Sequence, residues 1–141
     1  MCRVKAMYER RLEGSLKILA IIPAYNEGKT IRDVILDIKR HVPEADILVV
    51  NDGSRDNTLQ AAKEPGVFVA DLPFNLGIGA AMQTGYIFAR DGGYDFAVQV
   101  DGDGQHSAEC IYGLLEPLFA GNADMAIGSR YMEQNGYKSS A

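Results

Sequence analysis

The sequence reads Val98-Gln99-Val100-Asp101-Gly102-Asp103-Gly104-Gln105-His106 where an apolar run that begins at Phe96 stops at a carboxylate. Apolar β-formers followed by Asp and Gly are typical of a buried strand that ends in a tight loop. Two aspartates at such a strand end can turn toward one point, where their charges repel unless a cation or a proton is shared. Mg²⁺ and Mn²⁺ prefer oxygen ligands of this kind. Taken alone, the run also fits an ordinary turn, because Asp and Gly are common turn residues.

The same strand-then-loop pattern recurs on both sides of this stretch. Short apolar segments predict strands at residues 17–22, 47–50, 67–70, 96–100 and 123–127. Apolar residues at helical spacing predict helices between them, at residues 30–41, 58–63, 80–90 and 107–120. Asn26 and Ser107 are the expected N-caps of the first and the last of these helices. The alternation predicts an α/β fold, a three-layer α/β/α sandwich with a mainly parallel sheet.

Composition and charge narrow the class of protein. The 141 residues suffice for one domain with a hydrophobic core, and the net charge of −5 argues against nucleic acid as a partner. Cys2 and Cys110 form neither a metal-binding spacing nor a disulfide framework, which favours a cytoplasmic location. No apolar run approaches the roughly 18 residues that span a membrane. We expect residues 1–15 to form a flexible or short helical arm and residues 16–141 to form the domain.

Polar side chains follow each predicted strand, and the carboxyl ends of parallel strands meet at one edge of a sheet. A carboxylate such as Asp52 can accept hydrogen bonds from a nucleobase or a ribose, and Tyr25 can stack on a base or simply pack at the domain rim. Gly77 and Gly79 precede a helix and either admit an anion or only satisfy loop geometry. Together these residue types predict a site for a nucleoside diphosphate that carries a leaving group. The residues expected at this edge are Tyr25, Glu27, Asp52, Ser54, Asp71, Asp101, Asp103, Gln105 and Arg130.

Other ligand motifs do not fit. Gly77 and Gly79 lack the third glycine of a dinucleotide-binding fingerprint, and no Gly-Lys-Ser/Thr phosphate loop occurs. The run from Asp101 resembles the start of an EF-hand loop, but His106 stands at the required glycine and Tyr112 at the bidentate acid. The role of His106, as a metal ligand or as an orienting group, stays open.

Five motifs occur in order: Ile22-Pro23-Ala24-Tyr25-Asn26-Glu27, Val50-Asn51-Asp52-Gly53-Ser54-x-Asp56-x-Thr58, Asn75-x-Gly77-x-Gly79-x-Ala81, Asp101-Gly102-Asp103-x-Gln105-His106 and Gly128-Ser129-Arg130-Tyr131. This ordered set resembles the amino-terminal half of the family 2 glycosyltransferases, which have the GT-A fold. It is most similar to the polyprenyl-phosphate and dolichol-phosphate mannosyl- and glucosyltransferases. The resemblance implies a metal-dependent enzyme that transfers a sugar from a UDP-, GDP- or dTDP-sugar to an acceptor such as polyprenyl phosphate. One departure is Asn51, where the family often has aspartate.

The resemblance also implies roles for individual residues. Asp101 and Asp103 would be catalytic and, with Gln105, would hold Mg²⁺ or Mn²⁺, which stabilises the departing nucleoside diphosphate. The substrate-binding residues implied are Pro23, Tyr25 and Glu27 at the nucleotide, Val50 and Asp52 at the base, Asp101, Gly102 and Asp103 at the ribose and diphosphate, and Arg130 at the diphosphate or sugar.

The family's chain normally continues past the Gly-Ser-Arg-Tyr motif into an acceptor-binding region. We therefore expect a truncated, donor-binding portion of such an enzyme, cytoplasmic or peripheral at the cytoplasmic face of the membrane. The alternative is a non-catalytic nucleotide-binding fragment that forms homo-oligomers through the surface which the missing half would cover. A nucleotidyltransferase fits less well, because no glycine-rich basic loop follows the first strand.

Overall fold

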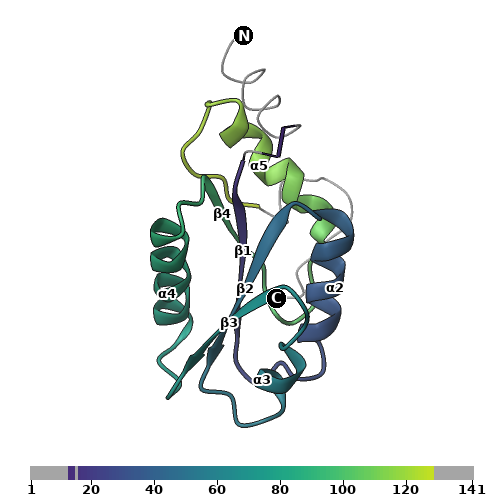
Figure 1. The fold of residues 1–141 in the computed structure, drawn as a ribbon, viewed down its shortest axis with the longest axis vertical. Coiled ribbons are helices and arrows are strands. Elements are labelled where there is room, and N and C mark those ends of the chain that lie inside the picture. The colour runs from purple at the N-terminus through teal and green to yellow at the C-terminus, as the bar shows by residue number, and fades with distance from the viewer. Residues whose placement is uncertain (1–12, 15, 129–141) are drawn as a thin grey trace, which may run out of the picture.

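The computed structural model of the 141-residue chain describes residues 13–14 and 16–128. Its four parallel strands form one sheet in the order β3-β2-β1-β4. The strands are β1 (Ile18–Ala24), β2 (Ala45–Asp52), β3 (Val67–Leu72) and β4 (Phe96–Gln99). The helices are α2 (Ile31–His41), α3 (Thr58–Ala61), α4 (Ile78–Asp91), the short 3₁₀ helix η1 (Ala108–Cys110) and α5 (Ile111–Phe119). Helix α4 covers one face of the sheet, and α2, α3 and α5 lie on the other (Figure 1), which confirms the expected α/β/α sandwich.

Strand β1 lies inside the sheet because its side chains are apolar on both faces. Each residue from Ile18 to Ile22 is at most 1% exposed. Ile18, Ala20 and Ile22 pack in the cluster that includes residues of α2 and α5, whereas Leu19 and Ile21 pack in the cluster on the α4 side. A continuous apolar run of this kind is typical of a parallel strand covered by helices on both faces.

Gly85 allows α4 to approach the sheet closely. A Cβ at this position would lie 2.4 Å from Cγ2 of Ile21, so any larger residue would push α4 away from β1. The position of α4 against the sheet matters for the site, because the first turn of this helix forms part of the cavity described below.

The helix predicted at residues 30–41 is confirmed as α2, but its expected cap is wrong. Thr30, not Asn26, occupies the N-cap position. Asn26 has a φ of 54° and joins two loops: its backbone N–H donates to Oγ of Ser54 (2.9 Å), and its Oδ1 accepts from the amide of Arg55 (2.8 Å). Asn is one of the few residues that adopt a positive φ readily, and here its side chain makes a long-range contact instead of a cap.

The strand expected at residues 123–127 is not formed. This segment is irregular, and Met125 and Ile127 are 76% and 80% exposed. A strand requires a neighbour that accepts and donates ladder hydrogen bonds, and the sheet of the described residues ends at β4, which pairs with β1. The cap expected at Ser107 is confirmed, since its Oγ accepts from the amide of Glu109 before η1.

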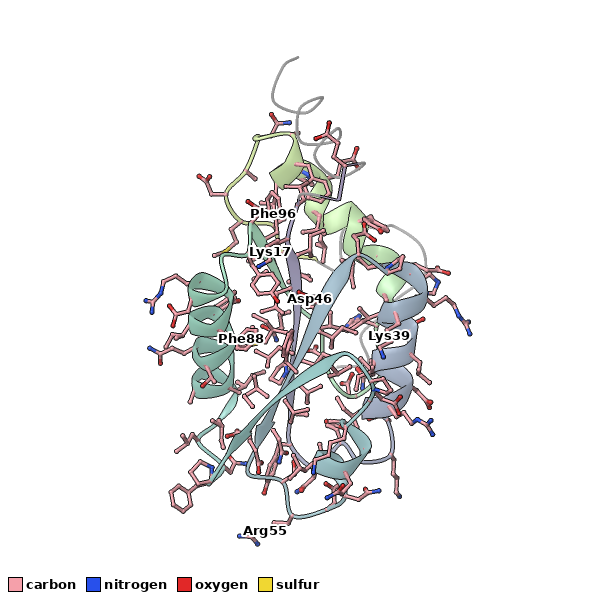
Figure 2. All side chains as sticks on the ribbon, in the orientation of Figure 1. Lys17, Lys39, Asp46, Arg55, Phe88 and Phe96 are labelled. Atoms are coloured by element: carbon pink, nitrogen blue, oxygen red, sulfur yellow. The ribbon has the colours of Figure 1, made fainter. Side chains whose placement is uncertain are left out.

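The strand order places a topological switch point between β1 and β4. The chain leaves β1 through α2 toward β2, and later returns through α4 to β4 on the other side of β1. In open α/β sheets, ligands bind at such a point, outside the carboxyl ends of the strands. Arg55, in the loop after β2, marks that end in Figure 2, while Lys17 and Phe96 lie toward the opposite end. Within the described residues, no helix is long and apolar enough to cross a membrane.

Candidate functional site

A cavity of about 430 Å³ opens at the carboxyl ends of the strands, where the switch point lies. Its walls come from the ends of β1 and β2, the loops that follow β1 and β4, and the first residues of α4. The lining residues are Pro23, Ala24, Tyr25, Glu27, Asp52, Ile78, Ala81, Asp101, Gly102 and Asp103. Segments far apart in the sequence therefore meet at one site.

The structure gathers most of the residues proposed from the sequence. Those that line the cavity are Pro23, Tyr25, Glu27, Asp52, Asp101, Gly102 and Asp103. Four proposed residues do not. The side chain of Val50 is fully buried in the core beside α4, and Gln105 is exposed but is not part of the lining. Ser54 and Asp71 line a separate pocket next to Asn51 and Asp56. Arg130 lies outside the described residues. The individual roles assigned to these residues stay predictions.

Three lining residues were not proposed from the sequence: Ala24, Ile78 and Ala81. A signal for all three exists, because Ala24 and Ala81 belong to two of the five motifs and Ile78 lies between Gly77 and Gly79. Small and apolar side chains carry no chemical signature of their own, so only the fold places them at the cavity.

Asp52 shapes one wall of the cavity. Its side chain is 4% exposed; Oδ1 accepts from the amide of Leu76 (2.7 Å) and Oδ2 from the amide of Gly77 (2.9 Å). Gly77, at a φ of 94°, is the N-cap residue of α4. A carboxylate is favourable at the positive end of a helix and satisfies amides that have no partner within the helix. Both oxygens of Asp52 thus already have backbone partners.

The loop after β1 is held by the loop after β2. The amide of Glu27 donates to Oγ1 of Thr58 (2.8 Å), and the amide of Gly28 donates to Oδ2 of Asp56 (3.0 Å). The hydroxyl of Thr58 and the amides of Thr58 and Gly28 hold the pKa of Asp56 below its ordinary value of 3.8, against the opposing effect of desolvation. Glu27 therefore projects from an anchored loop at the cavity.

The segment after β4 presents two carboxylates. Backbone pairing to β1 continues as far as the amide of Val100, which donates to the carbonyl of Ile21 (2.9 Å). Oδ1 of Asp101 then accepts from Nε2 of Gln99 (3.1 Å), and Oδ1 of Asp103 accepts from the amide of Gln105 (3.0 Å). Within the described part of the chain, the second oxygen of each carboxylate is left without a hydrogen-bond donor.

The cavity is strongly acidic. Four of its lining residues are acids, Glu27, Asp52, Asp101 and Asp103, and no Lys, Arg or His of the described residues lines it. No group of three or more His, Cys, Asp or Glu side chains in residues 13–14 and 16–128 forms a metal site by itself. Asp101 and Asp103 nevertheless match the usual donor set for Mg²⁺, which is one or two carboxylates completed by water and substrate phosphates.

The structure also explains the departure at Asn51. Asn51 pairs with Asp71 in the register of β2 and β3, and its Nδ2 donates to Oδ1 of Asp71 (2.7 Å). An aspartate at position 51 would place two carboxylates side by side, where like charges repel. The amide removes that repulsion, although it leaves its own Oδ1 buried without a hydrogen-bond donor.

Comparison with known proteins agrees with this geometry. Residues 19–140 match the family model described as Glycosyl transferase family 2. The chain is 38% identical over 120 residues to undecaprenyl-phosphate mannosyltransferase of Micrococcus luteus and 38% identical over 122 residues to polyprenol monophosphomannose synthase of Mycolicibacterium smegmatis. These matches cover 82% of this chain in both cases but 49% and 46% of the two relatives, so the chain spans about half their length.

A solved structure of similar fold is glucosyl-3-phosphoglycerate synthase from Mycobacterium tuberculosis, crystallised with Mn²⁺, uridine-diphosphate-glucose and phosphoglyceric acid. It matches with a TM-score of 0.64 and 26% sequence identity, over 84% of this chain and 43% of that one.

Proposed function

The chain belongs to glycosyl transferase family 2, and from this premise we propose that its cavity binds the nucleoside diphosphate sugar that donates the sugar in the transfer. The observation that carries the proposal is the meeting of Glu27, Asp52, Asp101 and Asp103 at the switch point, without a lining cationic side chain among the described residues. Such a cavity repels a diphosphate unless a divalent cation accompanies it. A metal–diphosphate pair is therefore the ligand that suits its charge.

A divalent metal ion, Mg²⁺ or Mn²⁺, is part of this proposal. Asp101 and Asp103 would hold it, and when bound it would supply Lewis-acid stabilisation of the leaving nucleoside diphosphate. Tyr25, 41% exposed at the cavity wall, offers an aromatic face to the base. Asp52 holds the start of α4 in place, and this keeps Ile78 in the lining of the cavity. The Mn²⁺ and UDP-glucose in the similar solved structure support this assignment.

The proposed acceptor is a polyprenyl phosphate, and it is supported by the names of the two relatives that share 38% of the aligned residues. An ionised phosphate oxygen can attack the anomeric carbon of the donor sugar directly. A new bond forms from that oxygen to the carbon as the bond to the diphosphate breaks, and the nucleoside diphosphate departs with the electron pair. No side chain has to remove a proton in this step. A peripheral position at the membrane surface would follow from such an acceptor.

A second candidate is a nucleotide-binding chain without transfer activity, which self-associates. The observation in its favour is the exposure of two apolar side chains, Met125 at 76% and Ile127 at 80%, which a second copy of the chain could cover. Two measurements separate the candidates. The first is the transfer of a radiolabelled sugar to polyprenyl phosphate, with phosphoglyceric acid as the comparison acceptor. The second is the molecular mass of the chain in solution. Metal-dependent binding without transfer to either acceptor, together with a dimer or larger species, supports the second candidate.

A thermal-shift panel tests donor binding. UDP, GDP and dTDP are each added with Mn²⁺, with Mn²⁺ and EDTA, and without metal. Because a ligand that binds only the folded state stabilises it by RT ln(1 + [L]/Kd), we expect the melting temperature to rise with at least one nucleotide, in the presence of free Mn²⁺ only. The absence of a metal-dependent rise with every nucleotide would contradict the proposal.

A further inference from the structure

We propose that Thr30 is a positioning residue, which holds the peptide of Gly102 in place so that Asp101 and Asp103 stay directed at the cavity. Oγ1 of Thr30 donates a hydrogen bond to the carbonyl oxygen of Gly102 at 2.7 Å, across 72 residues of sequence. The effect of this bond on metal-dependent binding rests on the function proposed above, whereas its effect on the loop itself does not.

The hydroxyl of Thr30 has one hydrogen and three oxygens within reach. The carbonyl of Gly102 is at 2.7 Å, while the carbonyl and Oε2 of Glu27 are both at 3.3 Å. O–H···O hydrogen bonds are usually 2.7–2.8 Å long, so the geometry favours Gly102 as the acceptor.

Thr30 is a fixed donor. Its amide donates to the carbonyl of Glu27 (3.0 Å), and its carbonyl accepts from the amide of Val34 (3.1 Å) at the start of α2. Helix α2 is in turn anchored in the core by Ile31 and Ile35, both 0% exposed. The loop that carries the carboxylates is thereby tied to a rigid part of the fold.

Residues 101–104 have few other attachments. Their remaining hydrogen bonds are local, from Gln99 in β4 and from the amide of Gln105. Among the residues that the structure describes, the bond from Thr30 is the one hydrogen bond that ties 101–104 to an element other than β4. Gly102 stands between two like charges, which favour separation of Asp101 and Asp103 whenever no cation lies between them. The bond from Thr30 opposes that movement.

Two substitutions at Thr30 separate the effect of the hydroxyl group from the effect of the side chain's shape. Thr30→Val keeps the β-branched shape of the side chain. It removes only the donor. Thr30→Ser keeps the donor and loses a methyl group. Thr30→Val therefore changes the hydrogen bond at constant shape, and Thr30→Ser changes the shape while keeping the hydrogen bond.

Hydrogen exchange of the 141-residue chain, without ligand, is the direct test. We expect Thr30→Val to speed exchange of the Gln105 amide, which donates to Oδ1 of Asp103 in this loop, by roughly tenfold, as the loss of one hydrogen bond implies, with β2 unchanged and Thr30→Ser close to the parent chain. Mn²⁺-dependent affinity for UDP and GDP should fall by a similar factor in Thr30→Val alone. Equal exchange of the Gln105 amide in the two variants, or a rise in Thr30→Val that extends equally through β2, overturns the positioning role. If the parent chain binds neither nucleotide with Mn²⁺, the proposed donor site fails, while the exchange comparison still decides the role of Thr30.

Discussion

Asp52 and Gly77 are 25 residues apart in sequence, and the amide of Gly77 donates to Oδ2 of Asp52 at 2.9 Å. The other oxygen of Asp52 accepts from Leu76 at 2.7 Å. A buried carboxylate at the end of β2 thus fixes the beginning of α4, which also lines the cavity. The cavity keeps its shape because a strand end and a helix start are joined directly.

We predict that Asp52→Asn destabilises the fold by about 1–3 kcal/mol, since the amide has one acceptor oxygen and would turn its NH₂ group toward a backbone N–H. Urea unfolding at neutral pH measures the change. Asp71→Asn is the matched control, because Asp71 is exposed and the variant keeps the oxygen that accepts from Asn51. We expect the control to change stability by less than about 0.5 kcal/mol. Equal stability of the two variants would show that the Asp52 contacts contribute little.

The hydrogen bonds that Asp56 accepts from Thr58 and Gly28 predict that the stability of the fold falls in acid. They hold the pKa of Asp56 below 3.8 in the folded chain, so this contribution to stability is complete above that value and is lost as the pH falls through the folded pKa. Unfolding curves of the parent chain and of Asp56→Asn, measured from pH 7 to pH 2, should converge at the acid end. A constant difference between the two chains over this range would contradict the assignment.

We predict that Tyr94 loses its proton at a higher pH than an ordinary tyrosine. Its hydroxyl donates to Oδ2 of Asp46 (2.6 Å), and burial together with the bond and charge of Asp46 raises its pKa from 10.0 to about 12. Because the pKa of Tyr94 is higher in the folded chain than in the unfolded chain, its hydroxyl stabilises the fold below pH 10. This stabilisation is lost as the pH rises through about 12. Absorbance titration of the seven tyrosines should include a late component that disappears in Tyr94→Phe. Tyr86→Phe, a change at a 51% exposed ring, should keep that component.

The sequence pattern predicted the α/β sandwich because short apolar runs such as 18–22, alternating with segments of helical periodicity, are typical of parallel strands covered on both faces. It failed at residues 123–127, where composition suggests a strand but pairing decides whether one forms. It also misassigned Asn26, since an Asn before a helix has the same local sequence signature whether it caps that helix or bridges to another loop.

For the site, the carboxylates were predictable because acids at the ends of parallel strands must meet at one edge of the sheet. Ile78 and Ala81 were not proposed, although they lie in or beside a motif, since their side chains carry no chemical signal of their own. The position of α4 against the sheet brings them to the cavity. Val50 shows the opposite failure. It belongs to one of the five motifs, yet its side chain lies in the core and its backbone is within β2, which pairs with β1 and β3.

The metal ligands can be tested residue by residue at Asp103 and Gln105. Asp103 lines the cavity, whereas the side chain of Gln105 is exposed and does not, and its backbone amide alone supports Asp103. We therefore predict that Asp103→Asn lowers Mn²⁺-dependent nucleoside diphosphate affinity by at least about tenfold, because it removes a charged ligand. Gln105→Ala, which keeps the backbone amide, should stay within about twofold. Calorimetric titration of the nucleotide at fixed Mn²⁺ gives both values, with the melting temperatures of the free chains as the control for folding. An equal loss in Gln105→Ala would mean that its side chain turns toward the metal on binding, and the ligand set would then include all three residues expected from the resemblance.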